Sequence, residues 1–261
     1  MKPFILFCLV FFLSNNCHAQ KIYNVETAPS LRTKSYSRGP YKNIVIFSAP
    51  RTGSSLIYNI FKFLFEEDAY LLARHDRFNL DRAVLRTHRF NEFNLTDKEN
   101  TLCVFTFRNP IDAVISHYRL YTQKPINTKK VAQTLINKQL KYLLFSQEIE
   151  KAGQSIIRHR FEDSVANMDF IFELIENHFN ISIDPKDKEL MKVCYSKENI
   201  QACIKNLKDF NEYLPISGFH GKHVTLNKYV PPKDLLYWLN IYLEDVKPLF
   251  QTYGYFLDSS I

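Results

Sequence analysis

The sequence predicts an α/β fold: a three-layer arrangement in which helices flank both faces of a parallel sheet. Short apolar runs rich in β-branched and aromatic residues alternate along the chain with longer stretches of helical periodicity. Alternation of this kind is typical of parallel sheets covered by helices on both faces. Residues 42–261 have the length of a single domain, and 46% hydrophobic residues suffice for a substantial core.

The expected elements follow from these runs in chain order. We expect strands near residues 43–48, 70–74, 83–87, 102–107 and 155–160. We expect helices near residues 54–66, 110–121, 129–151, 163–179 and 232–251. Pro110 suits the first turn of its helix, and Pro231-Pro232 stand at the start of the last one. In such a sheet, ligands bind beyond the carboxyl ends of the strands.

The N-terminal residues 1–19 have the pattern of a secretory signal peptide. Lys2 supplies the positive start, Phe4 to Leu13 is apolar, and Cys17-His18-Ala19 gives a cleavage pattern of small residues. The apolar run is too short for a membrane span, so we expect none after cleavage; an uncleaved signal anchor is the alternative. The expected location is the secretory pathway lumen, the periplasm or the outside of the cell. Residues 20–41 are polar and are expected to form a lead-in or stem.

The charge of the chain favours anionic partners. The formal net charge is +7 at pH 7, and removing residues 1–19 takes away one lysine, which leaves +6. This balance suits anionic substrates and is too diffuse to indicate nucleic acid.

Three cysteines remain after removal of the signal, and none has the C-x-x-C spacing of a metal site. We therefore expect no metal. In an oxidising compartment a disulfide between Cys194 and Cys203 is plausible. Sequons at Asn94 and Asn180 predict a glycoprotein if the host is eukaryotic.

The most informative segment follows the first expected strand. Arg51, Thr52, Gly53, Ser54 and Ser55 lie between that strand and an amphipathic helix. A loop that enters a helix N-terminus presents backbone N–H groups and the positive end of the helix dipole, so it binds anions and phosphate in particular. Arg51 adds a permanent charge, and the hydroxyl residues add donors. The ordinary phosphate loop of nucleotide hydrolases has a G-x-x-x-x-G-K-[ST] pattern that this loop lacks.

A second basic residue, Arg108, ends the strand expected at 102–107. It opens the stretch Arg108-Asn109-Pro110-Ile111-Asp112, and Ser116 lies about two helical turns further on. An arginine makes bidentate contacts with phosphate oxygens, and a serine hydroxyl can donate one more hydrogen bond.

The two segments together resemble those of the sulfotransferases that use 3′-phosphoadenosine 5′-phosphosulfate (PAPS). The loop P-[KR]-[ST]-G-[ST]-[ST] resembles their 5′-phosphosulfate loop, and R-[ND]-P-x-[DE]-x-x-x-S resembles their 3′-phosphate site. The resemblance covers roughly residues 42–255. It implies a sulfotransferase fold, PAPS as co-substrate and a hydroxyl acceptor. Arg51 in place of lysine leans towards the secretory, carbohydrate-type members.

The resemblance also implies a catalytic base. Arg86-Thr87-His88 resembles the K-T-H segment of the cytosolic members, with His88 as the base and Phe90 in place of the usual proline. A neutral imidazole can accept the proton that the attacking hydroxyl loses, while Arg51 stabilises the charge on the leaving phosphate. Glu92 is the alternative, because carbohydrate-modifying members often use a carboxylate.

Two weaker similarities complete the site. Phe161-Glu162-Asp163 resembles the Y-E-D segment near the adenine, and Gly218 to Gly221 keeps the spacing of the R-K-G-x-x-G-x-W loop. The basic pair and the tryptophan of that loop are absent, but Gly221 and Lys222 are expected to help hold the 3′-phosphate.

Two other functions stay open at this point. One is an inactive sulfotransferase-like module that binds anionic glycans, which the altered C-terminal loop and the arginine-rich stretch 74–89 favour. The other is a nucleotide-dependent phosphotransferase, against which the missing Gly-Lys pair argues.

Overall fold

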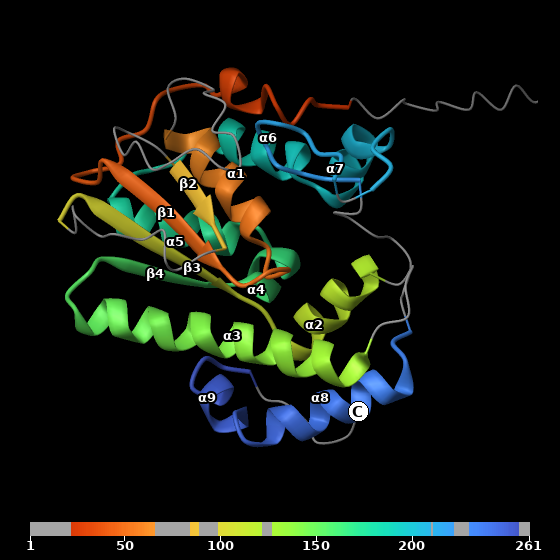
Figure 1. Ribbon diagram of the computed structural model, residues 1–261. Helices are drawn as coiled ribbons and strands as arrows, with labels where there is room; N and C mark the ends of the chain where they lie inside the picture. The colour runs from red at the N-terminus through yellow and green to blue at the C-terminus, as the bar shows by residue number, and fades with distance from the viewer. Residues whose placement is uncertain are drawn as a thin grey trace, which may run out of the picture.

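A four-stranded parallel sheet forms the centre of the molecule. The computed structural model describes residues 22–65, 84–88, 99–121, 127–209, 211–221 and 230–255. Within them the strands are β1 (Asn43–Ser48), β2 (Val84–Thr87), β3 (Thr101–Phe107) and β4 (Ile156–Arg160), in the order β2-β1-β3-β4 (Figure 1). All three strand pairs are parallel. The parallel α/β architecture expected from the sequence is therefore confirmed.

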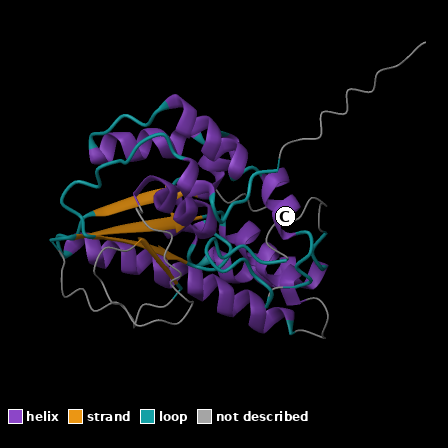
Figure 2. Ribbon diagram, turned by 90° about the horizontal axis from the view of Figure 1, so that it is seen from above, coloured by secondary structure: helices purple, strands orange, loops and turns teal. Residues whose placement is uncertain are grey.

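Alternate residues of the strands face two separate cores. Ile44 and Ile46 pack with α1 (Ser54–Phe65) and α5 (Asp169–Phe179) on one face. Val45 and Phe47 pack with α3 (Thr128–Lys151) and α8 (Lys233–Glu244) on the other. Successive side chains of a strand point to opposite faces, so a strand with helices on both sides must be apolar throughout. Every residue of β1 and β3 is buried, and the layers are visible in Figure 2.

The remaining helices complete the two outer layers. They are η1 (Ala28–Leu31), α2 (Pro110–Tyr118), η2 (Arg119–Tyr121), α4 (Phe161–Ala166), α6 (Pro185–Cys194), α7 (Lys197–Ile204) and α9 (Lys247–Gln251). The helix expected at 163–179 is two helices, α4 and α5, because the backbone of Asn167 is extended and its side chain accepts from Asp169 N at 3.0 Å. The helix expected at 232–251 is likewise divided into α8 and α9, at Asp245 and Val246.

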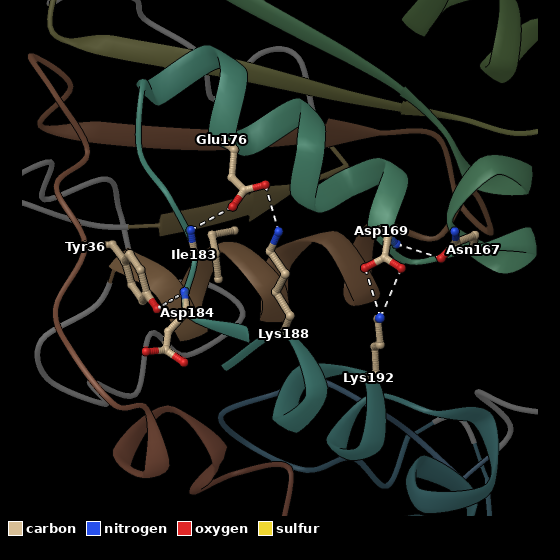
Figure 3. A network of polar contacts seen from close by, with 8 residues as sticks. All are labelled: Tyr36, Asn167, Asp169, Glu176, Ile183, Asp184, Lys188 and Lys192. Carbon is tan, nitrogen blue, oxygen red and sulfur yellow. Dashed lines mark hydrogen bonds and ion pairs between the residues drawn. The ribbon is translucent and has the colours of Figure 1, made fainter. Parts of the chain in front are cut away.

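Helices α6 and α7 had no counterpart among the expected elements. Figure 3 shows how α6 is attached to α5: Lys188 pairs with Glu176 at 2.8 Å, and Lys192 pairs with Asp169 at 3.0 Å. The Glu176 carboxylate also accepts from Ile183 N at 2.7 Å, at the entry to α6. Partly exposed ion pairs of this type contribute little individually, so α6 is held mainly by buried residues such as Met191.

The segment expected as a lead-in packs against the domain. Val25 and Ala28 are buried in the same core as α1. The buried Asp187 carboxylate accepts from Thr33 N and Thr33 Oγ1, both at 2.8 Å, and from the Tyr36 hydroxyl. Residues 22–41 are thus part of the fold through buried apolar and hydrogen-bonded contacts.

Several expectations concern residues outside the described ranges. These are the signal peptide at 1–19, the strand at 70–74, and Asn94, Glu92 and Lys222. Among the described residues, no helix has both the length and the apolar character to cross a membrane.

The described cysteines are free thiols, and no disulfide joins Cys194 to Cys203. The Cys203 thiol donates to the Tyr23 carbonyl at 3.2 Å, and the Asn199 amide donates to the Cys194 carbonyl at 2.8 Å. The expected disulfide is therefore not present in the structure.

Candidate functional site

The loop between β1 and α1 has a backbone that is rare for L-amino acids. Arg51 has φ 70° and Gly53 has φ 84°, both in the left-handed region. A non-glycine residue in this conformation is strained, and such strain is concentrated at functional sites. Loops of this kind turn backbone N–H groups towards one point, and α1 adds the N–H groups of its first turn. The loop is therefore suited to bind an anion.

Thr52 fixes this loop to the sheet. Its hydroxyl donates to the Ala49 carbonyl at 2.9 Å and lies 2.9 Å from the hydroxyl of Thr106, near the end of β3. The side chain is 1% exposed. Thr52 can therefore offer a ligand its backbone N–H, while its hydroxyl holds the loop in place.

The Arg51 side chain lies between α2 and the C-terminal loop. Its Nε donates to Ser116 Oγ at 3.0 Å, and its NH1 is 3.4 Å from Nε2 of His220. Burial, followed by the nearby Arg108 and Arg119, lowers the pKa of Arg51 to about 10. Arg51 is still charged at neutral pH. The lowered pKa means that its cation lacks stabilisation, which an anionic ligand would supply.

Arg108 approaches the same loop from the end of β3. Its NH1 donates to the Arg51 carbonyl at 3.3 Å, and its guanidinium lies 4.8 Å from the centre of the Phe161 ring. Burial lowers the pKa of Arg108, and Asp112, Glu162 and Tyr255 act in the opposite direction. The structure thus brings together Arg51, Arg108 and Ser116, which the sequence placed in two separate motifs.

Phe161 lies between the two motifs. A Cβ atom placed on Gly53 would be 2.8 Å from Cε2 of the Phe161 ring and closer still to Cδ2. Position 53 requires glycine for two reasons: its backbone has φ 84°, and a Cβ atom would overlap the Phe161 ring. Phe161, expected near the adenine, is therefore packed between the loop and Arg108.

His88 follows β2 beside the loop. Its Nδ1 lies 2.8 Å from the Ser48 carbonyl and 3.3 Å from the Ser48 hydroxyl. A carbonyl oxygen only accepts, so the short contact assigns the proton to Nδ1. In the neutral ring Nε2 then carries the lone pair, and the side chain is exposed. This is the form that a general base requires.

His117 is a residue of this region that sequence reasoning missed. Burial lowers its pKa to about 4, and the charges of Arg51, Lys138 and His88 contribute. His117 is therefore neutral at pH 7. The sequence indicated its place near the site only through its position after Ser116, and nothing distinguished it from a core residue.

Arg86, in the lysine position of the T-H segment, contacts the start of α1. Its guanidinium donates to the Ser55 hydroxyl and lies 5.5 Å from the centre of the Tyr58 ring. Ser54 and Ser55 both lie in the first turn of α1 and are nearly buried. A second guanidinium thus reaches the same helix N-terminus from β2.

The C-terminal loop reaches this site through His220. Gly221 N donates to the carbonyls of Asp209 and Glu212 at 3.0 and 3.2 Å. A Cβ atom on Gly221 would lie 2.8 Å from Asp209 N, so this position requires glycine. Lys222 follows directly and lies outside the described residues, as does Glu92. Across the described ranges, no group of His, Cys, Asp and Glu residues could hold a metal ion.

Comparison with known proteins supports the fold. No family model and no curated protein matches the sequence. Among solved structures, the chain is similar to the mouse sulfotransferase SULT7A1 complexed with PAP, with a TM-score of 0.53 and 14% identity over 87% of each chain. At this identity the likeness shows a shared fold, the α/β sulfotransferase fold.

Proposed function

We propose that this protein transfers a sulfuryl group from PAPS to a hydroxyl acceptor, which we infer to be a carbohydrate. The observation that carries the proposal is the contact between Arg51 and Arg108. These half-buried cations come from the carboxyl ends of adjacent parallel strands, and Arg108 NH1 donates to the Arg51 backbone carbonyl at 3.3 Å. The two guanidinium charges repel one another, which contributes to the lowered pKa of Arg51, and an anion with several charges, such as PAPS, would relieve that repulsion.

The residues present fit the two anionic ends of PAPS. The backbone of residues 51–55, the Arg51 guanidinium and the N-terminus of α1 would hold the 5′-phosphosulfate. Arg108 and Ser116, with Gly221 and Lys222 from the C-terminal loop, would hold the 3′-phosphate. The mouse neighbour was solved in complex with PAP, which supports PAPS as the co-substrate.

The proposed chemistry is an in-line displacement at sulfur. The acceptor hydroxyl loses its proton to His88 Nε2 as its oxygen forms a bond to sulfur. The bond from sulfur to the bridging oxygen breaks, and PAP leaves with the additional negative charge on its 5′-phosphate. The Ser48 carbonyl holds the His88 ring through Nδ1 at 2.8 Å, and Arg51 stabilises the charge on the leaving phosphate. No step needs a metal ion.

The acceptor class and the compartment are further parts of the proposal. The arginine at position 51 and the signal-like residues 1–19 support a carbohydrate acceptor in a secretory lumen, the periplasm or the outside of the cell. The basic net charge supports an anionic glycan over a neutral one.

A thermal-shift titration with PAP, ATP and ADP, with and without magnesium, tests the function. We expect a magnesium-independent shift that is selective for PAP, because a ligand that binds only the native state raises the melting temperature. Arg51→Ala and Arg108→Ala should abolish it. Arg158→Ala is the matched control, since Arg158 pairs with Glu150 at 2.7 Å away from the site.

Other outcomes would support the two alternatives. A shift with ATP that requires magnesium, and none with PAP, would place the protein among phosphotransferases. Retention on heparin with no shift from any nucleotide would indicate an inactive glycan-binding module.

A further inference from the structure

We propose that His220 is a positioning residue for Arg51, an inference that rests on the proposed sulfuryl transfer. Arg51 NH1 lies 3.4 Å from His220 Nε2. A guanidinium only donates hydrogen bonds, so Nε2 must accept and the His220 ring must be neutral with its proton on Nδ1. Ser116 accepts from Nε of the same guanidinium at 3.0 Å. Arg51 is thus held at two nitrogens, by α2 and by the C-terminal loop.

The loop that carries His220 is fixed by a separate set of contacts. The Glu26 carboxylate accepts from the backbone N–H groups of Ile216 and Ser217 at 2.8 and 2.7 Å. Asn59 Nδ2, on α1, donates to the carbonyls of Ser55 and Ser217 at 2.7 and 3.0 Å. The N-terminal segment and α1 therefore tie this loop to the loop that contains Arg51.

Two glycines allow the loop to approach so closely. Gly218 has φ 68°, and a Cβ atom there would lie 2.7 Å from NH2 of Arg86. Gly221 packs its Cα against the backbone of Asp209. His220 also forms an antiparallel bridge with Tyr213, and Leu214 N donates to the Phe219 carbonyl at 2.7 Å. His220 is 5% exposed, so its ring is held by the surrounding structure.

The consequence for catalysis follows from the way the Arg51 side chain is held. A long side chain loses rotamer freedom when it is fixed, so it needs contacts such as those with Ser116 and His220 to keep one orientation. In the proposed reaction the guanidinium acts on charge that develops at the leaving oxygen, which depends on orientation. His220 therefore affects the rate of transfer more than the binding of nucleotide.

The test compares three variants in turnover of labelled PAPS, with water or the best acceptor from a screen. His220→Leu removes the acceptor nitrogen and should lower kcat about tenfold, with less than about a threefold change in KM for PAPS. His220→Gln supplies an amide oxygen in place of Nε2 and should restore kcat to within about threefold of the wild type. Ser217→Ala is the control, because Ser217 is buried in the same loop and has no contact with Arg51 among those described.

A double-mutant cycle separates positioning from a general effect on stability. In an Arg51→Lys background, which keeps a cation for PAPS but lacks the guanidinium NH1 that faces His220, His220→Leu should cause little further loss of kcat. Equal losses in both backgrounds, or no rescue by His220→Gln, would overturn the role of His220 and leave the proposed function intact. A wild-type protein that neither binds PAP nor consumes PAPS would overturn the proposed function and this role together.

Discussion

Arg51 Nε and Ser116 Oγ lie 3.0 Å apart, although 65 residues separate them in the sequence. The contact joins the loop after β1 to the seventh residue of α2. The two motifs identified in the sequence are therefore in direct contact. Ser116, expected to contact the 3′-phosphate, in addition orients the cation expected at the 5′-phosphosulfate.

Replacing Ser116 by alanine should weaken the binding of PAP. The variant loses a hydrogen bond to a charged group and a donor to phosphate, so we expect an affinity about tenfold lower. Calorimetric titration with PAP measures the change. Ser146→Ala is the control, because Ser146 donates to the Leu143 carbonyl within α3, away from the site. An unchanged affinity in Ser116→Ala would remove Ser116 from the binding site.

Replacing Gly53 by alanine should destabilise the fold and abolish PAP binding. The new Cβ would overlap the Phe161 ring at a position with φ 84°. We expect a loss of roughly 1–3 kcal/mol for the backbone strain alone, with the steric overlap adding to it. Chemical denaturation measures the free energy of unfolding.

A matched control isolates the steric part. Gly153 has φ 77°, and a Cβ there would have nothing within 4 Å. Gly153→Ala should therefore lose only the strain component. If both variants lose the same free energy of unfolding, the overlap of the new Cβ with the Phe161 ring does not contribute to the loss of stability.

The two inner strands of the sheet, β1 and β3, could be predicted because they are buried on both faces. Such strands are continuous apolar runs, which a sequence shows directly, and their ends then locate Arg51 and Arg108. Helices α6 and α7 were missed because their exposed faces are rich in charged residues and their apolar positions are few. The division between α4 and α5 depends on a local bond of Asn167, which periodicity does not detect.

The site could be predicted only as far as its motifs. Each motif is a continuous stretch of sequence that follows a predicted strand, so its residues and its place at the end of that strand could be predicted. The contacts between motifs are not: His220 reaches Arg51 across 169 residues through a loop fixed by Glu26 and Asn59. The inward orientation of the Thr52 hydroxyl likewise depends on Thr106, a tertiary neighbour.

Glu162 should prove important for stability as well as for the site. One carboxylate oxygen accepts from Asn109 N at 2.7 Å, and the other accepts from the Tyr255 hydroxyl at 3.2 Å. Glu162→Ala leaves both donors without this acceptor, so we expect a loss of about 1–3 kcal/mol in the free energy of unfolding. Since Asn109 follows Arg108, PAP binding should weaken too.

Asp163 provides the comparison for Glu162. Its carboxylate is half exposed and lies 3.9 Å from Arg160, so Asp163→Ala should change the free energy of unfolding by less than about 1 kcal/mol. Denaturant titration of both variants decides the matter. Losses of similar size would mean that Glu162 acts only as a helix N-terminal charge.

His159 should make the fold less stable in mild acid. Burial lowers its pKa from 6.5 to about 4, and its Nε2 lies 2.6 Å from the hydroxyl of Ser164. Between these pH values the unfolded chain binds a proton that the folded chain does not, so stability rises with pH across this window and is complete above it. Lowering the pH from 7 to 5.5 should cost about 1 kcal/mol through this histidine. His117, whose pKa is also lowered to about 4, adds an effect of the same sign.

Denaturation of the wild type and of His159→Gln at pH 7 and pH 5.5 isolates the contribution of His159. The variant should lose about 1 kcal/mol less than the wild type between these pH values, whatever its stability at pH 7. An identical pH dependence in the two proteins would show that His159 takes up its proton equally in the folded and unfolded states.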